Sequence, residues 1–433
     1  MNLAHSNLAL DPALPQRDLL LDETLMAQYL SRLMTPYGAL GVGSCERLRT
    51  KYRVGASLRV LYRVEGVEQS YRIAARAFPK AHRTDRQSTE IHATELNTSF
   101  WLFPNDRKIR NLSVLDDVPV DLRNIQGQQW IKSRIVGHAP EKSLTAQCIG
   151  DNDAVLAYAK IYAGDEGRQV FNTYLHVNAE INQSHLRVPR ALSYSDNHRL
   201  LLLESLPGVS LSLVRNAGCS PAASGPRTAG LPLRASRPRS YAFFLLGRAL
   251  RDLHVVSPPS WLPRSTRLTP EALTRATATI NQARPDVALL VQQLRDRLLQ
   301  CHGTVCESEP VLLHGDVHPK NILLNNDRVY LLDLDQAAVG NALVDLASVI
   351  AGLYCASCVG ALTWSEAISL RRNLLAGYGP LKDSAALQWH IGAALLTERA
   401  LRSVTRIRLE SLQRLPDILA TAEAVLNGGL SEN

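Results

Sequence analysis

The sequence predicts an α+β fold in which a small antiparallel sheet lobe is followed by a larger helical lobe, with an extra N-terminal α+β segment before both. Three observations support this class. Apolar and polar residues alternate over residues 50–78 and again over 132–162, which is the period of half-buried strands. From residue 241 onward, apolar residues recur mainly at the spacing of helices.

The N-terminal segment predicts one helix followed by a strand meander. The helix is expected over "DETLMAQYLSRLM", residues 22–34. Residues 50–78 then form three antiparallel strands, with a turn at Gly66.

Residues 132–162 repeat the pattern of the first meander. The first copy ends in "ARAF" and the second in "AKIY". This similarity favours an internal duplication of a strand meander. The alternative is that any two amphipathic meanders resemble one another, and the sequence leaves both interpretations open.

The remaining elements follow the second meander. A helix over residues 164–184 places Val170 and Tyr174 on one face, and two short strands follow it over 187–194 and 198–205. The next predicted elements are a mobile loop over 212–240, rich in Ser, Gly, Pro and Arg, a helix over 241–256, and one long helix over 385–415.

Composition limits the cellular setting. The chain has 433 residues and a net charge of +8, but no dense Lys/Arg block, so we expect no nucleic-acid partner. It has no apolar run long enough to span a membrane and no signal-peptide pattern. Seven scattered cysteines suit a reducing compartment, so we expect a cytoplasmic protein.

The most informative stretch is "LLHGDVHPKNILLNNDRVYLLDLDQAAVG", residues 312–340. Two short strands around residues 325–327 would form a hairpin. The hairpin would bring Asp316 and Asn321 close to Asp333. Two carboxylates and an amide oxygen form a site that suits Mg²⁺, which takes few protein ligands and keeps waters and phosphates.

The spacing Asp-x-x-x-x-Asn, with a second aspartate downstream, is also the spacing of a kinase catalytic loop. Phosphoryl transfer needs metal ions to neutralise charge on oxygens and a carboxylate to accept the proton of the attacking hydroxyl. For one aspartate alone, capping of a turn is the simpler reading. The joint pattern of His314, Asp316, Asn321 and Asp333 favours catalysis.

"HGDVHPKN" followed by "LLDLDQAAVGNALVDLAS" resembles the aminoglycoside phosphotransferase and choline kinase family of small-molecule phosphotransferases. The resemblance covers roughly residues 131–355. It implies a protein-kinase-like, two-lobed fold with ATP as co-substrate and Mg²⁺ as cofactor. It also implies Asp316 as the catalytic base, with Asn321 and Asp333 as metal ligands.

The same resemblance assigns residues 1–130 to an N-terminal extension with a possible degenerate sheet lobe, 131–204 to an ATP-binding lobe, and 205–433 to a catalytic and substrate lobe. The nucleotide-binding lysine maps onto Lys160, where the first meander has Arg76.

A carboxylate should orient this lysine. Glu180 is the candidate and Glu166 its rival, and the sequence does not decide between them. The hinge that binds adenine maps onto Glu204, Ser205 and Leu206.

Two further residues are expected to be structural. His314 should hydrogen-bond the backbone of the catalytic loop, and Asp345 should anchor that loop rather than touch substrate. Lys320 departs from the family pattern, which commonly has glycine before the asparagine; this affects loop geometry and not the metal ligands.

The acceptor is not identified by the sequence. Arg399, Arg402 and Arg406 share a helix face, and Glu398 stands four residues before Arg402, which favours a salt-bridged face over the wall of an anion pocket. The near balance of acids and bases over 361–433 argues mildly against a polycationic aminoglycoside.

The sequence therefore predicts a kinase that phosphorylates a hydroxyl of a small molecule such as a sugar, an amino alcohol or an antibiotic-like compound. The alternatives are a catalytically silent nucleotide-binding regulator and a protein kinase.

Overall fold

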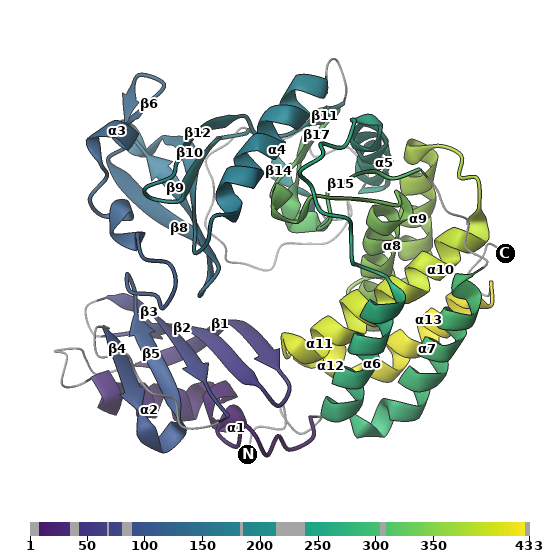
Figure 1. Ribbon diagram of the computed structural model, residues 1–433, viewed down its shortest axis with the longest axis horizontal. Coiled ribbons are helices and arrows are strands. Elements are labelled where there is room, and N and C mark those ends of the chain that lie inside the picture. Colours follow the sequence, from purple (N-terminus) through teal and green to yellow (C-terminus); the bar gives the residue numbers. More distant parts are fainter. Residues whose placement is uncertain are drawn as a thin grey trace.

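The computed structural model describes residues 8–34, 43–66, 69–79, 89–181, 185–213, 239–303 and 309–428. Within these residues the chain forms two five-stranded antiparallel sheets, a smaller mixed sheet and a helical half. Figure 1 shows the first sheet below the second at the left of the view, with most of the helices at the right. The α+β fold with a small sheet lobe and a larger helical lobe is as predicted.

The first sheet has the strand order β1-β2-β3-β5-β4. Two helices, α1 and α2, pack against its first two strands, and α2 is the helix predicted over 22–34. The elements are α1 (Arg17–Leu21), α2 (Glu23–Met34), β1 (Ser44–Arg53), β2 (Ser57–Glu65), β3 (Ser70–Ala77), β4 (Glu90–Ala93) and β5 (Thr98–Leu102).

The second sheet has the order β8-β9-β10-β13-β12, with α4 inserted after its third strand. These elements are β8 (Lys132–Ala139), β9 (Ser143–Ile149), β10 (Val155–Tyr162), α4 (Glu166–Glu180), β12 (Ala191–Ser195) and β13 (Leu200–Glu204).

The two sheets share one topology. Counted along the chain, the strands of both run first-second-third-fifth-fourth, and all neighbours are antiparallel. The first pair of each also carries a register shift, between Arg47 and Arg49 in one and between Ile135 and Gly137 in the other. The register also places Arg76 and Lys160 at equivalent positions. This agreement supports the duplication, which itself stays a prediction.

The segment between the two sheets packs with the second. Apolar side chains from Ile109 to Trp130 share a buried core with Leu144, Ala159 and Leu202 of that sheet. The segment holds α3 (Val120–Arg123), β6 (Asn124–Ile125) and β7 (Gln128–Gln129). The predicted domain boundary after residue 130 stays a prediction, although packing groups residues 109–130 with the second sheet.

The predicted polar hairpin forms in the helical half, within a small sheet of order β11-β17-β16-β14. Its strands and the nearby pair β15 and β18 are β11 (Leu186–Arg187), β14 (Val209–Ser210), β15 (Val311–Leu313), β16 (Ile322–Asn325), β17 (Arg328–Leu331) and β18 (Ala338–Gly340). The surrounding helices are α5 (Arg239–Val255), α6 (Pro270–Ala283), α7 (Ala288–His302), α8 (Leu343–Cys358), α9 (Trp364–Tyr378), α10 (Ser384–Ala394), α11 (Leu401–Thr405), α12 (Leu409–Gln413) and α13 (Leu415–Leu426).

The single long helix predicted over 385–415 is wrong. A π-helical segment (Leu395–Ala400) joins α10 to α11, and the run then ends where Ile407 adopts a left-handed backbone with φ of 48°. An α-helix cannot pass through that conformation. Most of the loop predicted over 212–240 lies outside the described residues. Of the helices that are described, none is long and apolar enough to cross a membrane.

Candidate active site

The hairpin brings the three predicted oxygen-bearing residues together. Ile322 pairs with Leu331, and the Leu332 amide donates to the carbonyl of Asn321 at 2.8 Å, so Asn321 lies beside the start of the segment that carries Asp333. The side-chain amide of Asn321 donates to the carbonyl of Asp316 at 3.2 Å. Asp316, Asn321 and Asp333 therefore belong to one connected loop structure.

The loop that carries Asp316 is fixed from behind by Asp345 of α8. Asp345 is fully buried, and its carboxylate accepts the amide N–H groups of His314 at 2.7 Å and Gly315 at 3.0 Å. Burial would raise the pKa of Asp345, but the hydrogen bond from His254 and nearby positive charges outweigh it and lower that pKa. The anchoring role predicted for Asp345 is confirmed.

His314 is the second support of the loop. The Asp316 amide donates to its Nδ1 at 3.2 Å, so the ring proton lies on Nε2, which donates to the Leu332 carbonyl at 2.9 Å. The predicted structural role of His314 is confirmed. Gly315 has φ of +78°, and a Cβ there would lie 1.9 Å from the Gln336 carbonyl oxygen, so only glycine fits.

The carboxylate of Asp316 faces one guanidinium group and one imidazole ring. Its Oδ1 lies 3.7 Å from Arg402 Nη1, and its Oδ2 lies 3.6 Å from His318 Nε2. Burial lowers the pKa of His318, which keeps that ring neutral near pH 7. The side chain of Asp316 is 25% exposed, so it is open to a ligand.

The salt bridge expected between Glu398 and Arg402 is wrong. The structure pairs Glu398 with Arg267 and with the hydroxyl of Ser348, and it turns Arg402 toward Asp316 instead. The expectation assumed a regular helix, and the π-helical segment that ends at Ala400 changes which residues share a face.

Lys160 connects the second sheet to the hairpin. Its buried Nζ lies 2.7 Å from Asp333 Oδ1 and 2.7 Å from Asp335 Oδ1. Burial opposes the charge on Lys160, but the two carboxylates outweigh it and raise the pKa of this amine. In turn, burial would raise the pKa of Asp333, but Lys160 holds it well below its usual range.

Glu180, the predicted partner of Lys160, lies elsewhere, and so does Glu166. Both are exposed, at opposite ends of α4, and the carboxylates that meet Lys160 are Asp333 and Asp335. The prediction of Glu180 is therefore wrong as a contact of Lys160. The prediction failed because sequence spacing does not show how α4 and the hairpin pack around Lys160.

Sequence reasoning missed Asp335, Tyr162 and Tyr174. The Tyr162 hydroxyl donates to Asp335 at 2.9 Å, and the Tyr174 hydroxyl of α4 accepts the amide N–H of Asp333 at 3.0 Å. The repeated acid in "LLDLDQ" could have pointed to Asp335, since it follows Asp333 by two residues. Nothing in the sequence pointed to the two tyrosines.

A cavity of about 350 Å³ lies between the second sheet and the hairpin. Lys160, Asn321 and Asp333 line it, and so do the predicted hinge residues Glu204 and Leu206. Ser205 lies between the last two without lining the cavity. The Glu204 carboxylate accepts from the Arg190 guanidinium at 3.0 Å.

The donors present fit Mg²⁺. The amide nitrogen of Asn321 is used by the Asp316 carbonyl, which leaves its oxygen as the ligating atom, and one Asp333 oxygen remains beside the oxygen that meets Lys160. Among the described residues no cluster of three His, Cys, Asp or Glu side chains could hold a metal. A carboxylate and an amide oxygen, completed by phosphates and water, are typical of Mg²⁺ rather than of zinc or calcium.

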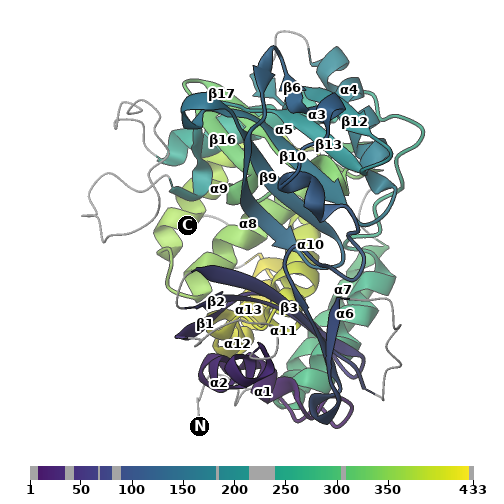
Figure 2. The same ribbon diagram turned by 90° about the vertical axis from the view of Figure 1, so that its left-hand side faces the viewer.

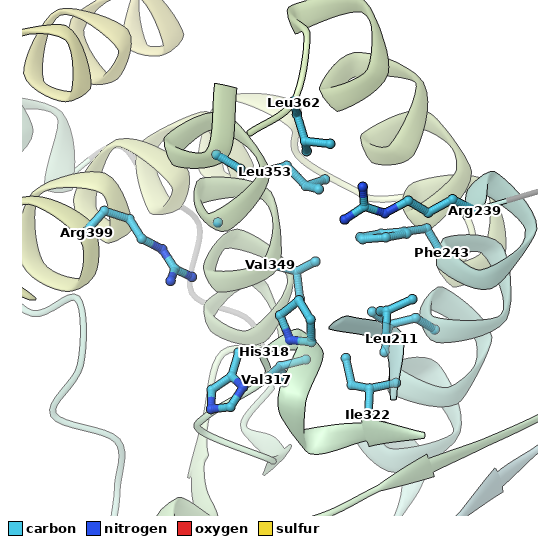
Figure 3. Close-up of a pocket in the computed structure, with 14 residues that line it drawn as sticks. Leu211, Arg239, Phe243, Val317, His318, Ile322, Val349, Leu353, Leu362 and Arg399 are labelled. Atoms are coloured by element: carbon cyan, nitrogen blue, oxygen red, sulfur yellow. The ribbon is translucent and has the colours of Figure 1, made fainter. Parts of the chain in front are cut away.

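A second cavity, of about 150 Å³, lies beside the loop that carries Asp316 and is shown in Figure 3. Phe243, Val349 and Leu353 give it mainly apolar walls, and the side chain of Arg239 extends along one side. His318 lines it, but Asp316, Asn321 and Asp333 do not. The cavity therefore meets the carboxylates only through His318, whose Nε2 lies 3.6 Å from Asp316 Oδ2.

A family model described as the phosphotransferase enzyme family, APH, matches residues 157–390. No curated protein matches the sequence.

Similar solved structures include three phosphotransferases. The gentamicin–APH(2'')-IIa complex is 12% identical, with a TM-score of 0.46 over 71% of this chain and 96% of that one. A thermostable mutant of aminoglycoside phosphotransferase APH(4)-Ia is 14% identical, with a TM-score of 0.46 over 70% and 97%. The macrolide 2'-phosphotransferase MphH from Brachybacterium faecium is 16% identical, with a TM-score of 0.38 over 71% and 97%. These identities say nothing about the acceptor of this chain.

Proposed function

The chain belongs to the phosphotransferase enzyme family, and on that premise we propose that it transfers the γ-phosphoryl group of ATP to a hydroxyl group of a small molecule. The proposal assigns ATP to the cavity between the second sheet and the hairpin. The segment of residues 204–206, of which Glu204 and Leu206 line this cavity, would border the adenine, and Lys160 would contact the phosphates.

Each residue of the site has one task in this proposal. Asn321 and Asp333 would hold Mg²⁺, which supplies neutralisation of the phosphate oxygens when bound. Lys160 adds a fixed positive charge to the same cavity. Asp316 would orient the acceptor hydroxyl and accept its proton, because its carboxylate is open to ligand and is held by a rigid loop.

One observation carries the proposal. Lys160 of the second sheet lies 2.7 Å from Asp333 of the hairpin, so residues 173 positions apart in the chain meet in a cavity that Asn321 also lines. A lysine, a carboxylate and an amide oxygen in one cavity are the groups that a magnesium nucleotide requires.

The test is ATP consumption with a panel of hydroxylated compounds, including sugars, amino alcohols, sugar phosphates, gentamicin and a macrolide. We expect Mg²⁺-dependent turnover with at least one compound, and a fall in kcat of about 10³-fold in Asp316→Ala, as for loss of a general base. Asp196→Ala, which changes an exposed aspartate, is the matched control and should keep full activity.

Two rival functions give different results. A catalytically silent regulator would bind Mg·ATP tightly and consume none of it with any compound. A protein kinase would label protein substrates in preference to the small molecules of the panel.

A further inference from the structure

The first sheet carries a row of bases across one face. Lys51 of β1 pairs directly with Arg59 of β2, which pairs directly with Arg76 of β3. Arg49 and Arg53 stand two residues on either side of Lys51, so they lie on the same face. Like charges directly opposite one another on neighbouring strands are destabilising, so this row requires a compensating group.

The turn between β8 and β9 forms the opposite wall. Together the turn and the sheet enclose a cavity of about 250 Å³. Its charged lining consists of eight bases and one acid: Arg49, Lys51, Arg53, Arg59, Arg76, Arg107, Lys108, Lys142 and Glu141.

The one acid is fully used. Glu141 is buried and accepts from Arg59 at 3.1 Å, from Arg107 at 2.9 Å and also from Arg76. In the described part of the chain, Arg49, Lys51 and Arg53 have no ion pair and no side-chain hydrogen bond. Among the described residues, these three bases of β1 therefore have no carboxylate in direct contact.

The protonation of Lys51 reflects this imbalance. Desolvation between the two walls, together with the charges of Arg59, Arg53, Lys142 and Arg49, lowers its pKa to about 8. A bound anion would reverse the effect of those charges.

The cavity adjoins the catalytic carboxylates. Arg49 is close enough to Asp316 and Asp333 for both carboxylates to raise its pKa against the effect of desolvation, and Lys142 Nζ lies 3.9 Å from Asp335 Oδ2. A ligand in this cavity would therefore reach the proposed site of phosphoryl transfer.

The C-terminal helices extend the positive surface to the other side of Asp316. The helix α11, which carries Arg402, packs against β1, and Figure 1 shows it beside that strand. Burial and the charges of Arg402, Arg408 and Arg49 lower the pKa of Arg406 to about 10. Figure 2 shows the first sheet, α11 and α12 below the second sheet. Positive charge thus approaches Asp316 from two elements that are far apart in sequence.

We propose that the acceptor is an anion, a small hydroxylated molecule whose phosphate or carboxylate groups bind between Arg49, Lys51 and Arg53 of β1 and the turn between β8 and β9. This inference rests on the proposed function and adds the chemical class of the substrate. A cavity of this size fits a molecule such as a sugar phosphate or a hydroxy acid and excludes a folded partner.

Other ligands fit this cavity less well. A polycationic aminoglycoside would be repelled by eight bases. The phosphates of ATP are assigned to Lys160 in the other cavity, which Arg49, Lys51 and Arg53 do not line. A neutral apolar acceptor would favour the cavity of Figure 3 instead.

The experiment compares matched acceptors in the Mg²⁺-dependent ATP consumption assay. The panel contains sugar phosphates and hydroxy acids, the corresponding neutral sugars, and gentamicin. We expect the highest kcat/KM with an anionic member and a KM for it that rises with salt. Lys51→Gln should raise that KM about tenfold and change kcat less than about twofold. The lost charged contact would be made equally in the bound ground state and in the transition state.

Arg63→Gln is the control, since Arg63 lies farther along β2 and is paired with exposed Glu46 at 2.8 Å. This variant should behave like the wild type. Equal or higher kcat/KM with a neutral sugar or with gentamicin would overturn the inference, and so would a Lys51→Gln variant with an unchanged KM.

A binding experiment separates failure of the inference from failure of the proposed function. With Mg·ADP saturating, fructose 1,6-bisphosphate should bind by calorimetry, fructose should not, and Lys51→Gln should weaken the binding about tenfold. Such binding without turnover of any panel member would support the anion site and count against the proposed function. Equal binding of fructose and fructose 1,6-bisphosphate would overturn the anion site even if the enzyme were active.

Discussion

Lys160 joins the second sheet to the segment after the hairpin by two ion pairs. It is 7% exposed, and its two partners, Asp333 and Asp335, would repel each other without it. A buried cation between two carboxylates is costly to remove, since the remaining charges stay desolvated.

Lys160→Met should therefore destabilise the folded protein by about 3 kcal/mol in the absence of Mg²⁺, as expected for breaking a buried ion pair. The measurement is denaturant unfolding in the presence of a chelator. Lys142→Met is the control, because Lys142 is 48% exposed and 3.9 Å from Asp335, and it should change the unfolding free energy by less than about 0.5 kcal/mol.

The same variant has a pH signature. Lys160 holds the pKa of Asp333 below its unfolded value, which is about 4, so the interaction contributes stability above that pH and loses it as the pH falls. The stability difference between wild type and Lys160→Met should be constant near neutral pH and should shrink below about pH 4. A difference that grows on acidification would contradict this account.

Residue-level prediction succeeded where the geometry is local. Asp316, Asn321 and Asp333 could be grouped because the hairpin register alone brings them together. The partner of Lys160 could not be found in this way, because it depends on how the second sheet packs against the hairpin. Glu180 was nearer in sequence, but Asp335 is nearer in space.

At the scale of elements, the loop that carries Asp316 is held by α8 as well as by its own hairpin. Asp345, near the start of α8, accepts two successive amide N–H groups from the loop and also meets His254 of α5 at 3.3 Å. Three elements therefore fix the position of Asp316.

Asp345→Asn should destabilise the protein by about 2 kcal/mol, because a charged acceptor of buried hydrogen bonds is lost. It should also lower kcat at least about tenfold through misplacement of Asp316, while the Kd of Mg·ADP stays within about twofold. Unfolding, turnover and calorimetry measure the three quantities. Asp417→Asn, exposed on α13, is the control. If the affinity for Mg·ADP fell by the same factor as kcat, the role of Asp345 would not be confined to the loop.

Helix breaks were harder to predict than strands. No Gly or Pro marks the end of α11, since Ile407 itself adopts the left-handed conformation. The amphipathic pattern continues through that position, and only packing of α11 against β1 and α6 shows why the chain turns there.

At the scale of the molecule, the first sheet is joined to the second through Glu141. This residue of the turn between β8 and β9 accepts from Arg59 and Arg76 of the first sheet. Their shared topology supports a duplicated origin, but only the second sheet keeps a lysine at the position of Lys160.

Glu141→Gln should destabilise the protein by about 3 kcal/mol, because three guanidinium groups lose their buried carboxylate. Added sulfate should recover more stability in this variant than in the wild type, since an anion can replace the carboxylate. Thermal unfolding with and without sulfate measures both effects. Glu46→Gln breaks an exposed pair with Arg63. This control should not lower the stability by a comparable amount, and sulfate should stabilise it no more than the wild type. Equal sulfate effects in both variants would contradict the role of Glu141.

The alternation of residues 50–78 and 132–162 was enough to predict two meanders and their separation from a helical half. The approach of β1 to α11 was not predictable, because it joins segments about 350 residues apart. For the same reason the cationic cavity between the sheets has no signature in the linear sequence.

The division of roles between Asp316 and Asp333 is the central claim. Calorimetric binding of ADP with and without Mg²⁺ to Asp316→Ala and Asp333→Ala tests it most directly. Asp316→Ala should keep the Mg²⁺-dependent gain in affinity, and Asp333→Ala should lose it, at least about tenfold. Equal loss in both variants, or full retention in Asp333→Ala, would contradict the account.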